Sequence, residues 1–391
     1  MSEVGLIEDG SVLIVDGLVA SFGPSRRVEN LADAKAAEII DANGHVVIPG
    51  FVDSHTHLIG PPIRTAQSKS SSERLDTPAA LFLASAAFIR STAGPTIEHQ
   101  ARRHLAAFLR HGTTTVEVKT GYGLVAGSEA KALRAVNSLG DDIANVVPTL
   151  LGAWTRPPDV KADTYIAQLC TDILPRVKEK KSVQMAEIFC DPEGFSEPEA
   201  RPYAETAARL RLPLKMHVDE TGRAGGAALA TEVGAVSVSG LNAIDDHDVQ
   251  ALARSQVVCT VLPACMLGSS RLRTPPARLL IDSGAALSLA SGFDPALPST
   301  YNMQAVISLA CLELGMTVEE ALVACTWNAA HALGIAARAG AIAANRPADI
   351  VILNVSDYRD IPVYFGANIV AAVLRSGSVV YREGPLQWQG E

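Results

Sequence analysis

The chain has 391 residues, of which 48% are hydrophobic and 19% charged, and its formal net charge is −9. This composition is typical of a globular protein with a large core, and the length exceeds one typical domain. No run of lysine and arginine favours a nucleic-acid or membrane surface, and no apolar stretch could span a bilayer. The six cysteines show no C-x-x-C spacing, and the first residues lack signal-peptide features. We therefore expect a cytoplasmic protein with reduced cysteines that binds neither nucleic acid nor membrane.

The first 50 residues predict a small β domain. Residues 11–15 and 18–22 are apolar runs separated by Asp16-Gly17, a pair that favours a type I′ hairpin turn. Residues 38–47 indicate a second hairpin.

From Phe51 onward the pattern changes to strands that alternate with alanine- and leucine-rich helices. The expected strands are 51–57, 113–118, 145–151, 185–190, 213–218, 235–239, 257–262 and 286–291. The expected helices include 96–110, 129–139, 197–210, 245–253, 302–314, 318–325 and 329–333. Eight strand–helix units over about 250 residues predict an α/β fold, a (β/α)8 TIM barrel. A doubly wound open sheet is the alternative.

The end of the chain returns to a β pattern at 348–353 and 371–381. The simplest architecture is one small β-sandwich built from residues 1–50 and 346–391. The barrel, residues 51–345, is then inserted between its two parts.

Three histidines fall at the carboxyl ends of predicted barrel strands, where barrel enzymes place their active sites. His55 and His57 end the first strand and point to one face, because side chains alternate along a strand. His217 ends the fifth strand. Three imidazoles with open coordination positions are typical of a zinc or iron site that activates water. Glu220 follows by three residues and could move a proton there, or could instead favour the N-terminus of the next helix.

Two cationic residues near strand ends are further candidates. Arg64 follows His57 by seven residues and could bind a substrate carboxylate through its two-pronged guanidinium. Lys119 begins a loop with two glycines, residues 119–123, which could fold tightly over the site. A solvated surface position is the alternative for both side chains.

The chain resembles the amidohydrolase superfamily and, within it, the imidazolonepropionases, over nearly its whole length. The superfamily-level matches are 49–57 (P-G-F-V-D-S-H-T-H), 328–330 with 332–334, and 348–351. The more specific matches are 118–124, 149–153, 189–190 with 194–196, and 215–220.

This resemblance implies a metal-dependent hydrolase of a cyclic amide C–N bond. It implies conversion of 4-imidazolone-5-propionate and water to N-formimino-L-glutamate, a step of histidine degradation. One zinc or iron ion would be held by His55, His57 and His217, with Glu220 assisting water or the ring nitrogen. Arg64 and Tyr122 would hold this small-molecule substrate. A homodimer is implied by the resemblance alone.

Several positions depart from the family pattern. Gly240 stands where the family has a water-activating histidine, and Gly292 where it has a metal-binding aspartate. Trp154 replaces a substrate-contacting histidine, and the serine-rich stretch 68–73 replaces a glycine-rich segment with a tyrosine. We hypothesise that Asp294, two residues after Gly292, supplies the missing carboxylate to the metal and to catalysis. Trp154 would then contact the substrate.

Three functional interpretations remain open. The retained histidines favour the imidazolonepropionase-like hydrolase. The departures favour either a divergent amidohydrolase acting on another carboxylate-bearing cyclic amide, or a non-catalytic paralog that only binds a ligand. A glycosidase barrel would require paired carboxylates at strand ends and would leave the histidines unexplained. Strand 185–190 contains no lysine, so we do not expect a second metal bridged by a carbamylated lysine.

Overall fold

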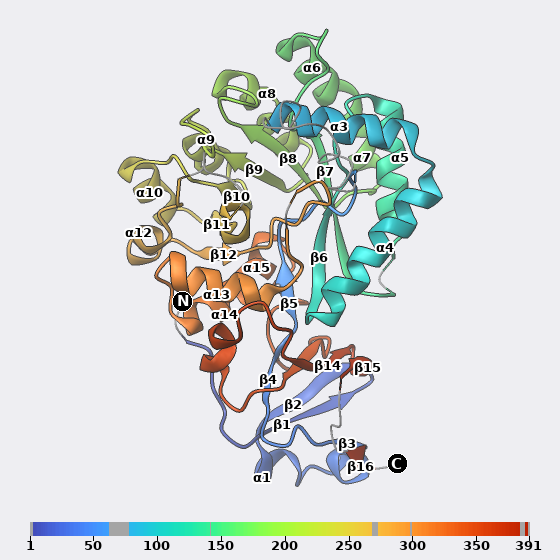
Figure 1. Cartoon of the computed structure of the whole chain (residues 1–391), viewed down its shortest axis with the longest axis vertical. Coiled ribbons are helices and arrows are strands. Elements are labelled where there is room, and N and C mark those ends of the chain that lie inside the picture. The colour runs from blue at the N-terminus through green and yellow to red at the C-terminus, as the bar shows by residue number, and fades with distance from the viewer. Residues whose placement is uncertain are drawn as a thin grey trace.

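A barrel of eight parallel strands forms the larger part of the molecule (Figure 1). The computed structural model describes residues 3–61, 78–140, 142–267, 273–297, 299–383 and 388–389. The barrel strands are β5 (Phe51–Asp53), β6 (Thr113–Lys119), β7 (Asn145–Ala153), β8 (Met185–Cys190), β9 (Leu214–Val218), β10 (Ser237–Gly240), β11 (Val258–Val261) and β12 (Leu287–Leu289). They pair in chain order, and a parallel bridge between Thr56 and Phe293 joins the two ends of the sheet. The predicted TIM-type barrel is confirmed.

The first barrel strand is shorter than predicted. β5 ends at Asp53, so His55 and His57 lie on the segment beyond the strand rather than on it. Backbone hydrogen bonds still fix this segment, because Gly292 N donates to His55 O over 3.1 Å and His57 N donates to Phe293 O over 2.7 Å. The histidines are therefore held by the turn after β12, not by a continuous strand.

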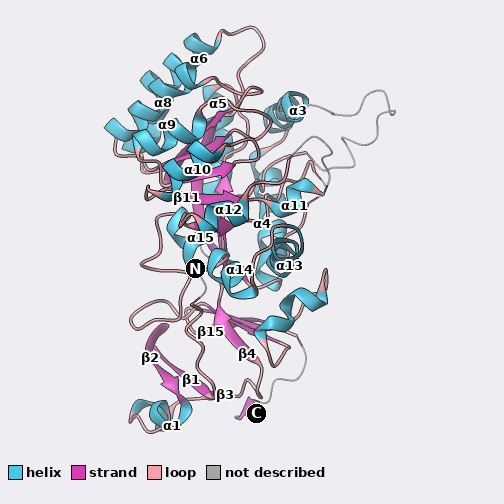
Figure 2. Ribbon diagram, turned by 90° about the vertical axis from the view of Figure 1, so that its left-hand side faces the viewer, coloured by secondary structure: helices cyan, strands magenta, loops and turns pink. Residues whose placement is uncertain are grey.

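Helices surround the barrel (Figure 2). They are α3 (Pro78–Ser91), α4 (Gly94–Arg110), α5 (Ala126–Asn137), α6 (Ala162–Gln168), the π-helical η3 (Leu169–Ile173), α7 (Leu174–Glu179), α8 (Glu197–Arg209), α9 (Gly226–Val233), α10 (Asp246–Ala253), α11 (Pro263–Met266), α12 (Ala277–Asp282), α13 (Met303–Glu313), α14 (Val318–Ala324) and α15 (Trp327–Ala332). α8 begins with a capping box, in which Glu199 accepts from Ser196 N over 2.9 Å. Among the described residues, no helix is long and apolar enough to cross a membrane.

The predicted N-terminal hairpin is confirmed. β1 (Gly10–Val15) pairs antiparallel with β2 (Leu18–Pro24), and Val15 lies opposite Leu18. Asp16 and Gly17 both have positive φ, 51° and 80°, as a type I′ turn requires. Two short helices follow, α1 (Ser25–Val28) and the 3₁₀ helix η1 (Asp33–Ala36).

The predicted second hairpin is wrong. β3 (Ile39–Ile40) pairs with β16 (Trp388–Gln389), and β4 (Val46–Pro49) pairs with β13 (Ile350–Leu353). Each strand finds its partner at the far end of the chain, because pairing there buries more apolar surface than two short strands could bury together.

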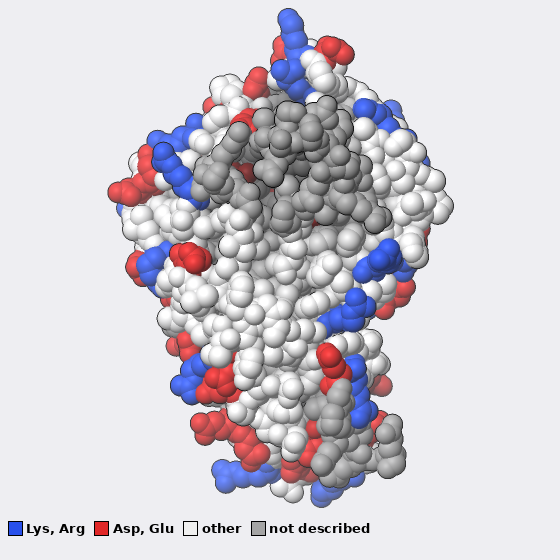
Figure 3. Space-filling model, viewed as in Figure 1, with Lys and Arg blue, Asp and Glu red and all other residues white. Residues whose placement is uncertain are grey.

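The two chain ends share one small β region below the barrel (Figure 1). Its antiparallel sheet has the order β15 (Ser378–Arg382), β14 (Val370–Arg375), β13, β4, and the 3₁₀ helix η4 (Tyr358–Tyr364) precedes β14. Val19 of β2 packs with Ile350, Ile352 and Leu374 in its core. The boundaries at residues 50 and 345 remain a prediction. On the face in Figure 3, acidic and basic side chains are interspersed around the margin.

Candidate metal centre

The two histidines after β5 lie side by side at the carboxyl end of the barrel. Their ring centroids are 5.6 Å apart, and both side chains are buried. Burial, followed by the positive charge of Lys119, lowers the pKa of His55 and of His57 well below the ordinary histidine value. Both imidazoles are therefore neutral near pH 7, which is the form that binds metal ions.

His217 is the next-to-last residue of β9, and its ring centroid lies 5.4 Å from that of His55. The hydroxyl of Ser239, on β10, lies 3.0 Å from Nδ1 of His217 and fixes the orientation of the ring. Nε2 then points away from Ser239, and it lies 3.1 Å from Oε2 of Glu220. Metal-binding histidines commonly have one ring nitrogen fixed by a hydrogen bond, while the other nitrogen binds the metal.

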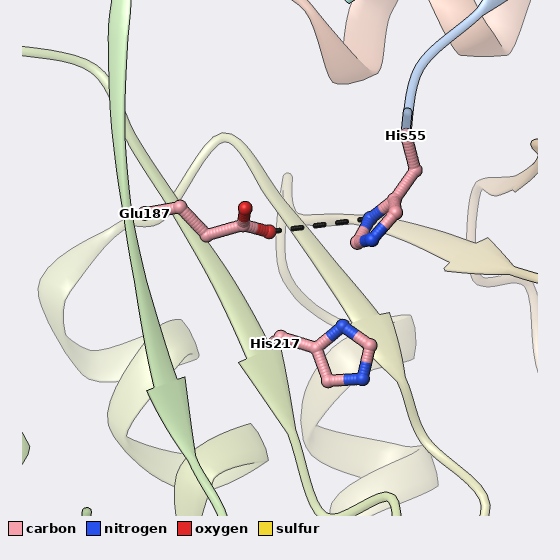
Figure 4. Close-up of side chains that lie close together, drawn as sticks. All are labelled: His55, Glu187 and His217. Atoms are coloured by element: carbon pink, nitrogen blue, oxygen red, sulfur yellow. Dashed lines mark ion pairs between the residues drawn. The ribbon is translucent and has the colours of Figure 1, made fainter. Parts of the chain in front are cut away.

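A carboxylate that the sequence analysis missed lies beside these histidines. Glu187 of β8 is fully buried, and its Oε1 is 4.0 Å from His55 Nδ1 (Figure 4). Ligand atoms of His55, Glu187 and His217 all lie within 4.8 Å of one another. Within the described part of the chain, His55 Nδ1, Glu187 Oε1 and His217 Nε2 are buried without a hydrogen-bond partner. Such atoms are costly unless a ligand satisfies them, so this donor set fits a divalent metal ion.

Buried charges beneath this group hold Glu187 in place. Lys119 forms ion pairs with Oε2 of Glu187 and, over 3.0 Å, with Glu117. Lys215 pairs with the other oxygen of Glu117 over 2.8 Å. Two lysines and two glutamates thus neutralise one another inside the barrel, as buried charges require. The surface alternative for Lys119 is therefore wrong, because its side chain is fully buried.

Tyr122 lies on the tight loop predicted after β6. Its hydroxyl is 3.5 Å from Nδ1 of His57, and the two rings stack with centroids 5.7 Å apart. Gly121 has a φ of 80°, and Gly123 N donates to buried Glu129 of α5 over 2.7 Å. The loop therefore brings a phenol to the histidines, and the role of Tyr122 in holding the substrate remains a prediction.

Trp154 is the first residue after β7 and lies over the site. Its ring centroid is 4.7 Å from that of His217 and 4.7 Å from that of Phe189, and it stacks on Phe189. Only 5% of this side chain is exposed. The residue that replaces the family's histidine thus contacts a candidate metal ligand directly.

Asp294 is buried near the site but lies outside the group of three. Its Oδ1 accepts a hydrogen bond from Ala296 N over 2.7 Å, and burial raises its pKa to about 6. His57 and Asp294 do not belong to the set of atoms within 4.8 Å of one another. The role of Asp294 as a ligand remains a prediction. Arg64 and the stretch 68–73 lie outside the described residues.

Glu220 is positioned by the turn after β9. Asp191, which follows β8, accepts hydrogen bonds from the backbone N–H groups of Glu220 and Thr221 over 2.8 and 2.9 Å. Asp219 accepts from Ala224 and Ala227 of the same loop. The carboxylate of Glu220 is thus held 3.1 Å from His217 Nε2 by a hydrogen-bonded turn, and its role in proton transfer remains a prediction.

The sequence profile of the Amidohydrolase family matches residues 46–380, and the chain belongs to this family. Within it, the chain is similar to imidazolonepropionases. It is 35% identical to the enzyme of Geobacillus kaustophilus strain HTA426, over 98% of this chain and 93% of the relative. It is 36% identical to the enzyme of Bacillus velezensis strain DSM 23117, over 98% of this chain and 92% of the relative.

Solved structures of other proteins share the fold. A zinc-bound adenosine deaminase from Xanthomonas campestris has a TM-score of 0.71 at 17% identity, covering 95% of this chain and 88% of that one. A 5-methylcytosine deaminase from Klebsiella pneumoniae has a TM-score of 0.75 at 17% identity, covering 96% of this chain and 95% of that one.

Proposed function

We propose that the chain is a metal-dependent hydrolase of a cyclic amide C–N bond, and that it opens the ring of 4-imidazolone-5-propionate to give N-formimino-L-glutamate. The observation that carries this proposal is the convergence of buried ligand atoms on His55, Glu187 and His217, none of which makes a hydrogen bond within the described residues. The likeness to imidazolonepropionases over 98% of the chain supports the choice of substrate.

His55, His57 and His217 would hold one divalent ion, zinc or iron, and either Glu187 or Asp294 would add a carboxylate. The ion would act as a Lewis acid toward the ring carbonyl and would make hydroxide available near neutral pH. Glu220, held beside His217, takes a proton from the attacking water and returns it to the leaving ring nitrogen. Tyr122 orients the ring, and Arg64 binds the propionate. The cytoplasmic location and the homodimer remain predictions.

Metal content and ring opening should be measured on the same purified protein. We expect one equivalent of zinc or iron and loss of 4-imidazolone-5-propionate, followed by its ultraviolet absorbance. A wild type that binds no metal after growth with added zinc and iron would overturn the proposal.

Paired variants identify the carboxylate ligand. Asp294→Asn tests the predicted ligand, and Glu187→Gln tests Glu187, because Lys119 keeps its ion pair with Glu117 over 3.0 Å in that variant. If one substitution lowers metal affinity, the carboxylate that it removes is the ligand. If both variants keep their metal, the histidines alone bind it.

A second candidate function is hydrolysis of a different carboxylate-bearing cyclic amide. The specific observation that favours it is Trp154, which lies 4.7 Å from His217 where the imidazolonepropionase pattern has a histidine. Activity toward another cyclic amide, with none toward 4-imidazolone-5-propionate, would establish this alternative. Metal binding without any hydrolysis would favour the non-catalytic paralog.

A further inference from the structure

Trp154 carries a polar atom that the fold leaves unsatisfied. Its indole Nε1 is buried, and in the described residues it has no hydrogen-bond partner. An indole N–H is a donor only; it neither accepts a hydrogen bond nor changes its protonation state. A buried donor without an acceptor costs about 1–3 kcal/mol, and tryptophan N–H groups in protein interiors usually find a partner.

The neighbours of Trp154 place its indole ring beside the histidines of the candidate metal centre. The ring centroid lies 4.7, 5.8 and 6.4 Å from those of His217, His57 and His55. The other neighbours are the aromatic rings of Phe82, Tyr122 and Phe189. Their centroids lie 5.8, 6.1 and 4.7 Å from that of Trp154, in that order. The Tyr122 hydroxyl and the imidazoles carry atoms that can accept a hydrogen bond, but within the described residues none of them bonds to the indole N–H.

We infer that Trp154 is a specificity-determining residue whose N–H binds an acceptor oxygen of the substrate ring. A ring that presents a carbonyl oxygen satisfies the indole, whereas a ring that presents an amino group at that position leaves two donors facing each other. The site therefore selects an oxo-substituted ring and rejects the amino-substituted ring of the same shape. A histidine at this position could donate or accept and would not make that distinction. The inference deepens the proposed function and rests on the site binding a cyclic amide.

A matched pair of ligands tests the inference. The probes are 4-imidazolone-5-propionate and 4-aminoimidazole-5-propionate, which keep the propionate and exchange the oxygen for an amino group. Kd is measured for both by calorimetry on protein brought to one equivalent of zinc, with hydrolysis of the first probe slowed by low temperature. We expect the wild type to prefer the oxo ring by at least about 10-fold, the scale of one buried, unsatisfied hydrogen bond.

Three variants separate the donor from the ring. Trp154→Phe keeps an aromatic side chain without the N–H and should reduce the preference to about 1–2-fold, with metal content unchanged. Trp154→His should also lose the preference while it binds both probes, because imidazole can donate or accept. Trp327→Phe, on α15, is 37% exposed and should behave as wild type.

The outcomes distinguish this inference from the proposed function. A Trp154→Phe variant that keeps the full oxo preference would overturn the inference even if the wild type opens the imidazolone ring. An oxo preference that disappears in Trp154→Phe would support the inference even if no hydrolysis occurs. A wild type that binds both rings equally would also overturn it.

Discussion

The two halves of the barrel mouth differ in what their strands carry. On one side the segment after β5, together with β8 and β9, supplies His55, Glu187 and His217, whose ligand atoms converge. On the other side β10 and the turn after β12 supply Gly240 and Gly292, both in left-handed conformation with φ of 89° and 62°. The first half keeps a metal-binding donor set, and the second half has no side chain to add at these two positions.

In the glycine half, neighbouring groups fill the space beside Gly240 and Gly292. A Cβ added at Gly292 would overlap Sγ of Cys265, which follows β11. A Cβ added at Gly240 would lie 2.6 Å from Val218 O and 3.0 Å from Nε2 of His217. The neighbouring groups therefore occupy the space that a side chain at either glycine would need. A metal site of this kind can survive on one half of the barrel only if that half supplies enough ligands by itself.

The largest expected effect comes from breaking the histidine half. His217→Ala should abolish stoichiometric zinc or iron and reduce ring opening by about 10³-fold or more, because a Lewis acid contributes several kcal/mol to the transition state. Metal analysis and steady-state kinetics measure both effects. His99→Ala, an exposed histidine of α4, is the matched control. Full metal content in His217→Ala would contradict the assignment of the centre.

An aspartate introduced at Gly292 should destabilise the fold unless Cys265 is changed with it. Gly292→Asp should lower the free energy of unfolding by about 3 kcal/mol, through overpacking and a left-handed backbone. Gly292→Asp/Cys265→Ala should recover most of that loss. Urea denaturation measures both, and a Gly292→Asp variant as stable as wild type would show that Cys265 does not fill the site.

Glu129, which holds the loop of Tyr122 in the histidine half, should make the stability of the protein depend on pH. Burial raises the pKa of Glu129 from 4.5 to about 7, so the folded state holds this proton more tightly than the unfolded chain does. Protonated Glu129 therefore contributes about 3 kcal/mol to the free energy of unfolding below pH 4.5. This contribution is lost as the pH rises toward 7. Glu129→Gln should flatten this slope in denaturation series from pH 4.5 to 7.5. Glu205→Gln, an exposed carboxylate, should leave it unchanged.

The smallest expected effect concerns the hydroxyl that orients His217. Ser239→Ala should weaken metal affinity by about 10–100-fold, as loss of a supporting hydrogen bond to a ligand usually does. Competition with a chelator measures the affinity. Ser237→Ala, on the same strand, removes a hydrogen bond to Ala332 O over 3.0 Å and should leave affinity unchanged. Equal affinities in the two variants would mean that Ser239 does not position the ring.

The positions of the strand-end histidines were readable from the sequence, because strand direction alone places His55, His57 and His217 at one end of a barrel. Glu187 was missed although it is on a predicted strand, since a glutamate in the middle of a strand gives no local signal of facing inward. Only its pairing with Lys119, which comes from another strand, makes that burial tolerable. The second hairpin was mispredicted for a related reason, because β3 and β4 pair with strands about 300 residues away.

The sequence by itself determined the barrel, the small β region built from the two ends of the chain, and the glycines at positions 240 and 292. These features follow from the local periodicity of apolar residues, from turn residues and from residue identity. All three can be read from residues that are close together in the sequence. The tertiary structure alone decided which ligand atoms converge and that Cys265 fills the space beside Gly292. It also decided that the N–H of Trp154 meets no acceptor among the residues the structure describes. Those facts depend on distances between strands far apart in the chain, and packing sets such distances.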